Sequence, residues 1–159
     1  MNLEGEFGLI WIDAHLDSHT IETSDSGNYH GMPISYLLGK GKDDLALIGS
    51  KNIKIKPEHI YIIGARSYEA EEENLLKNMG VKIYYIDHVI NSGFKSVFNE
   101  VLKAIKNDTK AYGISIDLDA FDPKVAPGTG TLEEKGLEKD IINNSVSYTH
   151  LTLPTSPKV

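Results

Sequence analysis

The sequence predicts an α/β fold built on a parallel sheet. Short apolar runs with strand character alternate along the chain with segments of helical periodicity, and this alternation is typical of parallel strands joined by helices. Two of the apolar runs lead directly into aspartate-rich motifs. Because open α/β sheets bind ligands at the carboxyl ends of their strands, these motifs mark the edge where a site is expected.

The first strand is predicted over Phe7–Ile12, and the motif Asp13-Ala14-His15-Leu16-Asp17 follows it. On a straight strand, Asp13 and Asp17 would be about 13 Å apart, which leaves little slack for both to bind one ion. We therefore expect the strand to end at Asp13 and the chain to curl into a loop there.

The next segment, residues 18–33, is predicted to be a loop because it is rich in Ser, Thr, Asp, Asn and Gly. It contains His19 and His30, and loops at strand ends often carry substrate contacts. A surface or capping role is the commoner fate of such a histidine. The position of His30 beside Gly31 and Pro33, in a polar loop near the aspartates, favours a role in proton transfer.

The middle of the chain alternates between helices and strands. The acidic first turn after Glu69 complements a helix dipole, and Gly80 supplies a stop. In the last helix, apolar residues recur at alternating spacings of three and one, which predicts an amphipathic helix on a core. The predicted elements are a short helix at Ile34–Leu38, a strand at His59–Ile63, a helix at Glu69–Met79, a strand at Lys82–Tyr85 and a helix from Phe94 to Ile105.

A fourth strand is predicted over Gly113–Leu118, and it carries the second motif, with Asp117 and Asp119. Residues of the same parity on a strand are about 6.6 Å apart, so two such carboxylates can straddle a pair of metal ions about 3.5–4 Å apart. Taken singly, each motif is more often a turn or a helix cap. Two motifs at one edge favour a binuclear metal centre, and carboxylates with few imidazoles and no cysteine suit Mn²⁺.

Composition places the chain among ordinary globular proteins. The 159 residues form one domain or a piece of one, with 40% hydrophobic and 25% charged residues. The net charge of −7 argues against general nucleic-acid binding. There is no cysteine, no charged-then-apolar leader and no long apolar run, so we expect a cytoplasmic protein with no membrane partner.

Three motifs together resemble the ureohydrolase family of arginases, agmatinases and formiminoglutamases. They are Asp-Ala-His-x-Asp at 13–17, Ser-x-Asp-x-Asp-x-x-Asp-Pro at 115–123 and Ala-Pro-Gly-Thr-Gly-Thr at 126–131, within a match from about Phe7 to about Ile142. Residues 26–33 look more like arginase than agmatinase. The resemblance implies an arginase-like α/β/α fold in three layers, a homo-oligomer (trimer or hexamer) and a site for two Mn²⁺ ions.

The resemblance also implies roles for individual residues. One ion would be held by Asp13, His15, Asp117 and Asp119, and the other by Asp13, Asp17 and Asp117. A hydroxide shared by the ions would attack the guanidinium carbon of L-arginine, giving ornithine and urea. Asp119 would orient the nucleophile and accept its proton, and His30 would relay protons to solvent. The residues near the substrate would be His19, Ser26, Asn28, Glu69, Glu72 and Thr131.

Some features depart from the family. His19 stands where arginases usually have an asparagine, and Glu69 where they have an aspartate, so agmatine, guanidinobutyrate and formiminoglutamate stay open as substrates. The chain has about half the family's length, without the upstream Gly-Gly-Asp-His segment or the downstream glutamate. We therefore expect a fragment that is inactive alone. The alternative of another class is a truncated, non-catalytic product that binds metal weakly or not at all.

The last residues do not continue the α/β pattern. Ser147–Val159 lacks a helical period and contains two prolines, which disfavour a strand. We therefore expect a partial catalytic domain over residues 1–146 and, over residues 147–159, a tail outside the family that is disordered or artefactual.

Overall fold

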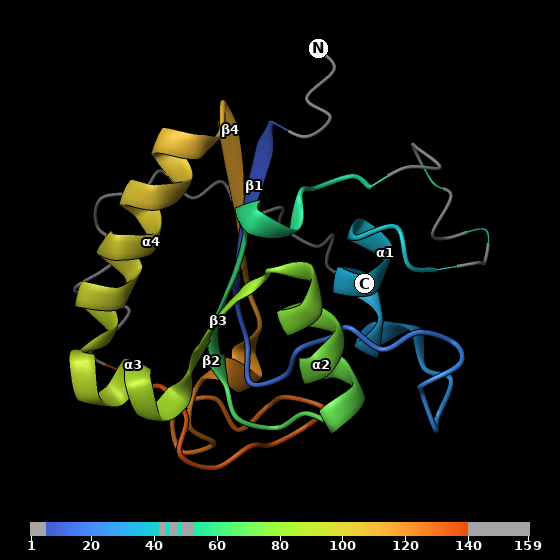
Figure 1. The fold of residues 1–159 in the computed structure, drawn as a ribbon. Coiled ribbons are helices and arrows are strands. Elements are labelled where there is room, and N and C mark those ends of the chain that lie inside the picture. The colour runs from blue at the N-terminus through green and yellow to red at the C-terminus, as the bar shows by residue number, and fades with distance from the viewer. Residues whose placement is uncertain (1–5, 42–43, 45–47, 49–52, 140–159) are drawn as a thin grey trace, which may run out of the picture.

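Four parallel strands form the sheet in the part of the chain that the structure, a computed structural model, describes: residues 6–41, 44, 48 and 53–139. The strands are β1 (Phe7–Ile12), β2 (Ile60–Ala65), β3 (Lys82–Tyr85) and β4 (Ala111–Ile116). They lie in the order β3-β2-β1-β4 (Figure 1), and every neighbouring pair is parallel. The predicted parallel sheet is confirmed.

Helices cover both faces of the sheet. On one side lie α3 (Ile86–Ser92) and α4 (Phe94–Asp108), and on the other α1 (Pro33–Leu37) and α2 (Ala70–Met79) (Figure 1). Short 3₁₀ turns are η1 (Tyr29–Gly31), η2 (Pro57–His59) and η3 (Leu118–Ala120). This arrangement is the three-layer α/β/α fold implied by the resemblance.

Side chains alternate between two cores, because successive residues of a strand point to opposite faces of a sheet. Ile10 and Ile12 of β1 belong to one core, with Ile105 of α4. Leu9 belongs to the other core, with Leu76 of α2. The two cores hold the helices on both faces and leave the ends of the strands free to carry loops.

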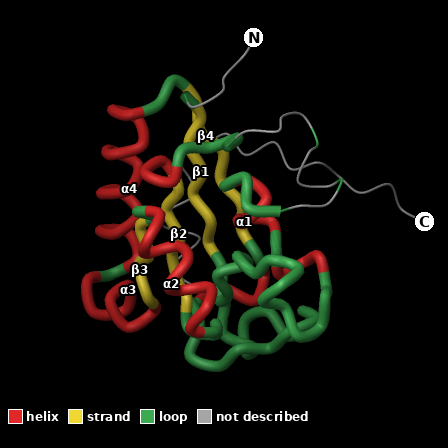
Figure 2. The backbone as a smooth tube through the Cα atoms, turned by 45° about the vertical axis from the view of Figure 1, so that its right-hand side comes forward, coloured by secondary structure: helices red, strands yellow, loops and turns green. Residues whose placement is uncertain are grey.

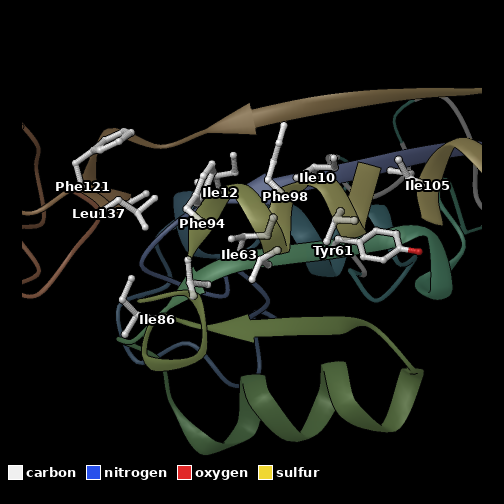
Figure 3. Packing of buried hydrophobic residues seen from close by; sticks show 14 residues of the cluster. Ile10, Ile12, Tyr61, Ile63, Ile86, Phe94, Phe98, Ile105, Phe121 and Leu137 are labelled. Carbon is white, nitrogen blue, oxygen red and sulfur yellow. The ribbon is translucent and has the colours of Figure 1, made fainter. Parts of the chain in front are cut away.

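The first core extends past the ends of the strands. Phe121 and Leu137, from two different loops, are almost fully buried and form an isolated parallel bridge. Figure 3 shows them beyond the arrowhead of β4, in the same cluster as Ile12 and Phe94. Their burial ties the loop after the second motif to the sheet.

Most of the predicted elements are confirmed, within one to three residues at their ends. β1 and β3 have the predicted bounds. The helix α2 begins after Glu69, its N-cap, and ends at Gly80, whose φ of 89° is the left-handed conformation that favours glycine. The helix α4 buries the predicted apolar stripe and continues to Asp108. The short helix α3 was not predicted, because only two of its seven residues are buried and so short a segment shows little periodicity.

Two predicted strands have different bounds. β2 begins at Ile60, because His59 lies in η2. The strand predicted over Gly113–Leu118 is confirmed as β4, but its bounds are wrong, because β4 begins at Ala111 and ends at Ile116, and η3 follows. The carboxylate of Asp117 accepts a hydrogen bond from the backbone N–H of Asp119 at 3.1 Å, a turn that competes with the extended strand. Asp117 and Asp119 therefore lie on a turn and not on one straight strand.

Parts of the prediction fall on residues that the structure does not describe. The proposed tail, residues 147–159, lies outside them, as does the end of the proposed domain from residue 140 onward. Among the described helices, none has the length and apolar character needed to cross a bilayer.

Candidate metal centre

The two aspartate motifs meet because β1 and β4 end at the same level of the sheet. Ile12, the last residue of β1, pairs with Ile63 of β2 and with Ile116, the last residue of β4. Asp13 and Asp117 each directly follow the last residue of a strand, so both lie at the carboxyl end of the sheet. Figure 2 shows that the loops gather at this end of the sheet.

The first motif curls back as soon as β1 ends, as predicted. Asp13 is 1% exposed, and its Oδ1 accepts a hydrogen bond from the backbone N–H of His15 at 2.7 Å. Asp17 has a φ of 47°, in the left-handed region, which turns the chain again. The other carboxylate oxygen, Asp13 Oδ2, is buried without a hydrogen-bond partner, so this atom is available to bind a ligand.

Asp119 connects the second motif to the first. The side chain of Asp119 is buried, and its Oδ1 accepts a hydrogen bond from the backbone N–H of Ala14 at 3.4 Å. The hydroxyl of Thr131 donates to Asp119 Oδ2 at 2.9 Å. The carboxylate is therefore held between the first motif and the loop that contains Thr131.

One histidine joins the two buried carboxylates. His15 Nδ1 lies 3.4 Å from Asp13 Oδ1 and 3.2 Å from Asp119 Oδ2. One ligand atom from each of these three residues lies within 4.8 Å of the others, a spacing that can hold a metal ion. Asp17 and Asp117 line the same cavity but do not belong to this group of three.

The electrostatics of this cluster favour a bound cation. Burial raises the pKa of Asp13, and burial together with the charge of Asp13 raises the pKa of Asp17 to about 8. The contacts with Asp119 and Asp13 raise the pKa of His15 to about 10. Burial alone would raise the pKa of Asp119, but the hydrogen bonds from His15 and Thr131 hold it below its ordinary value. A hard or borderline divalent cation fits this set of crowded carboxylates and one imidazole, in which Asp13 Oδ2 is buried without a hydrogen-bond partner.

A second polar cluster lies along the cavity, at the start of α2. His19 Nε2 lies 3.0 Å from Glu69 Oε2 and 3.4 Å from Glu72 Oε2. The buried carboxylate of Glu72 accepts from the backbone N–H groups of Ser18 (2.9 Å) and Glu69 (3.2 Å). Burial raises the pKa of Glu72, whereas hydrogen bonds, first with Glu72 and then with His19, lower the pKa of Glu69. His19 thus bridges one buried and one exposed carboxylate.

All of the residues singled out from the sequence line one cavity of about 930 Å³. Ser26, Asn28 and His30 come from the loop before α1, where they are exposed. The residues brought together there are Asp13, His15, Asp17, His19, Ser26, Asn28, His30, Glu69, Glu72, Asp117, Asp119 and Thr131. Their roles stay predictions, since shared position in a cavity does not by itself assign a role.

Several residues at the site were not given a role by the sequence. The guanidinium of Arg66, just after β2, donates to the backbone carbonyls of Asp119 (2.7 Å), Glu133 (2.9 Å) and Glu134 (2.9 Å). Burial lowers the pKa of Arg66, although nearby carboxylates oppose the shift. Asp122, within the second motif, accepts from two loop amides. The signal for Arg66 was its place directly after β2, the strand beside β1, which leads into the first motif.

Comparison with known proteins gives consistent matches. A sequence model described as the arginase family matches residues 1–151. The arginase of Bacillus caldovelox is 45% identical over 124 residues, covering 78% of this chain and 42% of that protein. The arginase of Bacillus subtilis is 43% identical, with the same coverage of each chain.

The fold gives the same match as the sequence. The solved structure of the Bacillus caldovelox arginase superposes with a TM-score of 0.85 at 41% identity, covering 88% of this chain and 47% of that one. The chain therefore spans less than half the length of the curated and solved relatives that it resembles here.

Proposed function

The chain belongs to the arginase family, and from this we propose that the whole protein hydrolyses the guanidinium group of L-arginine to ornithine and urea. Two bacterial relatives at 45% and 43% identity are arginases, which supports this substrate. The observation that carries the proposal is the cluster of Asp13, His15 and Asp119, whose two carboxylates are buried, with the partnerless Oδ2 of Asp13. This cluster has the donors that a metal-dependent hydrolase needs.

We propose that the resident metal is a pair of Mn²⁺ ions. Asp13, His15 and Asp119 would hold one ion with Asp117, and Asp17 would extend the site to the second. When bound, the ions would supply the nucleophile by lowering the pKa of a water molecule towards roughly 7. The donors at the cluster are mostly carboxylate oxygens, with a single imidazole. Such donors favour Mn²⁺ over the zinc of cysteine-containing sites.

The chain's own residues would orient the reactants and move protons. Hydrolysis joins a water oxygen to the guanidinium carbon and breaks the bond from that carbon to the side-chain nitrogen of ornithine. Asp119 is fixed by Thr131 and Ala14, so its carboxylate would orient the water and accept a proton for the leaving amine. His30 is exposed at the cavity, where it would exchange protons with solvent.

The cluster at the start of α2 would read the amino-acid end of the substrate. Glu72 with Glu69 keeps negative charge where an α-ammonium group would lie, and the imidazole of His19 can donate to a carboxylate. Ser26 and Asn28, from the exposed loop, would complete these contacts. We therefore rank arginine above agmatine, which lacks the carboxylate.

The test is Mn²⁺-dependent release of urea from L-arginine by the whole protein, with EDTA-treated protein as control. The same preparation is assayed with agmatine, guanidinobutyrate and formiminoglutamate, the last by release of formamide. A higher kcat/KM for any of these three than for arginine would overturn the substrate. Metal binding without turnover of any of them would favour a non-catalytic metal-binding protein.

We further propose that residues 1–159 alone do not hydrolyse arginine. The proposed metal site has only one imidazole, and the proposed ligand Asp117 is exposed, which weakens metal binding. Urea release by the purified 159-residue chain, with excess Mn²⁺ and arginine, should be below about a tenth of that of an intact relative, because loss of ligands or their support weakens metal sites by about 10–100-fold. Turnover within tenfold of the intact relative would contradict this proposal.

A further inference from the structure

Glu133 contacts the imidazole of His15 from the side opposite to the buried carboxylates. Its Oε1 lies 3.6 Å from His15 Nε2, an ion-pair distance longer than a hydrogen bond. The other ring nitrogen, Nδ1, is the one that faces Asp13 and Asp119. The two nitrogens of His15 therefore have different partners, and one of them is turned to the proposed metal position.

The side chain of Glu133 is itself held in place. The hydroxyl of Ser67, which follows β2 closely in the chain, donates to Glu133 Oε1 at 2.9 Å. Glu133 is one-third exposed, so without this bond its carboxylate could rotate into solvent. Ser67, Glu133 and His15 thus form a chain of contacts that runs from the end of β2 to the cluster.

The backbone of Glu133 is tied to the same frame. Arg66 Nη2 donates to the carbonyl of Glu133 at 2.9 Å and to that of Asp119 at 2.7 Å. Gly136 lets the loop pass close by, because a Cβ there would collide with the backbone of Phe121 and lie 2.6 Å from Arg66 Nη2. One guanidinium therefore fixes Glu133 relative to Asp119, a proposed metal ligand.

We propose that Glu133 is a positioning residue. Its carboxylate would hold the Nε2 side of the His15 ring and so orient Nδ1, the nitrogen that faces Asp13 and Asp119, for metal binding. The inference rests on the proposed metal centre and adds a residue that binds no ion itself. Metal-ligating histidines commonly give their second N–H to a carboxylate, which fixes the ring and the tautomer. Ser67 and Arg66 would supply the rigidity that this arrangement needs.

The test measures the Mn²⁺ affinity of the whole protein by calorimetry and by the EPR signal of free Mn²⁺. Glu133→Gln should weaken binding by about 10–100-fold, the range found for such supporting partners. The matched control is Glu134→Gln, because Glu134 is an exposed neighbour that offers Arg66 its carbonyl and not its side chain. Glu134→Gln removes the same negative charge as Glu133→Gln, but it should bind Mn²⁺ as tightly as the parent does.

A double-mutant cycle separates positioning from direct ligation. If Glu133 acts through His15, then Glu133→Gln should cost nothing further in a His15→Asn chain. A second cycle uses Ser67→Ala, which should weaken binding on its own but not when combined with Glu133→Gln. Melting temperatures of the metal-free variants should match the parent, which excludes a purely structural role.

Each outcome has a distinct meaning. If the whole parent protein binds no Mn²⁺, the proposed metal centre fails and this inference fails with it. If the parent binds and Glu133→Gln binds equally well, only the positioning role is overturned. An undiminished loss in the His15→Asn background would make Glu133 a metal ligand, and an equal loss in Glu134→Gln would show a general charge effect; either would overturn the inference.

Discussion

At the scale of single residues, the two oxygens of the Asp13 carboxylate have different roles at the end of β1. Asp13 Oδ1 closes a turn on the N–H of His15, while Oδ2 is buried without a partner. Asp117 makes the same turn with the N–H of Asp119. The turn role and the proposed ligand role of these aspartates are therefore compatible, because each carboxylate has a second oxygen to offer.

In the whole protein, replacing either proposed bridging aspartate should abolish the loading of a metal pair. Asp13→Ala and Asp117→Ala each remove a carboxylate that two cations would share, and a shared ligand supports both ions. Elemental analysis after dialysis against Mn²⁺ checks this, with Asp87→Ala on α3, a proposed bystander exposed on another element, as control. Retention of two ions per chain by either variant would reject the bridging assignment.

His30 offers a second test at this scale. It lies exposed in η1 at the cavity, and if it relays protons, His30→Asn should lower kcat of the whole protein by about 10²–10⁴-fold, the range for acid–base groups. Metal content should stay the same, and added imidazole should restore part of the rate. His88→Asn, at an exposed histidine of α3, is the control; an unchanged kcat for His30→Asn returns that residue to a surface role.

At the scale of elements, the loop after η3 depends on Asp122. Its Oδ1 accepts from the backbone N–H of Lys124 at 3.1 Å, and its Oδ2 from that of Lys135 at 3.0 Å. These bonds close the loop that carries Thr131 and Glu133 toward the cluster. Asp122, the last aspartate of the second motif, therefore stabilises the loop. The other two aspartates of that motif are the proposed metal ligands.

The stability contributed by Asp122 should depend on pH. The hydrogen bond from the Lys124 N–H, and further contacts with Lys124 and Lys135, lower its pKa in the folded state. A lowered pKa means that the contribution is present above the unfolded pKa, about 3.9, and is lost as pH falls through the folded value. Asp122→Ala should therefore lower the melting temperature at pH 7, and the difference from the parent should shrink as the pH falls below about 4.

Thermal melts followed by circular dichroism at a series of pH values check this prediction. Asp108→Ala removes an exposed aspartate at the end of α4 and serves as the control, for which no such narrowing is expected. A difference between Asp122→Ala and its parent that stays constant down to acid pH would show that the side chain stabilises the loop by packing and not by its charge.

At the scale of the whole molecule, β4 lies at one edge of the described sheet. Within the described residues, β4 is the last strand of the order β3-β2-β1-β4. Apolar side chains lie exposed at its end, Ile116 at 37% and Leu118 at 58%. Exposed strand edges with apolar side chains favour pairing with another chain.

The 159-residue chain should therefore self-associate through this edge. A charge there opposes strand pairing, so Ile116→Lys should shift the chain toward monomer in sedimentation velocity at a fixed protein concentration. Ile90→Lys changes an isoleucine of α3 that is 56% exposed, away from β4, and should leave association unchanged. Equal effects of both variants would point to added charge as the cause and would place association elsewhere.

Local patterns in the sequence were sufficient for most of the fold. Strand and helix periodicity act between near neighbours in the chain, so β1, β3, α2 and α4 could be predicted from them. The rule that parallel strands present ligands at their carboxyl ends then indicated where the two motifs would meet. The same local reasoning extended β4 to Leu118, because it did not count the turn that Asp117 makes with Asp119.

The sequence by itself determined the fold class, the strands that end in aspartates and the family that the motifs resemble. Only the tertiary structure decided which of those aspartates share one cluster, that Asp13 Oδ2 is left without a partner, and that Arg66 and Glu133 join the site. The physical reason is sequence distance. Contacts such as Arg66 with Glu133 depend on how β1, β2 and β4 align, and that register is set by packing the whole sheet between its helices.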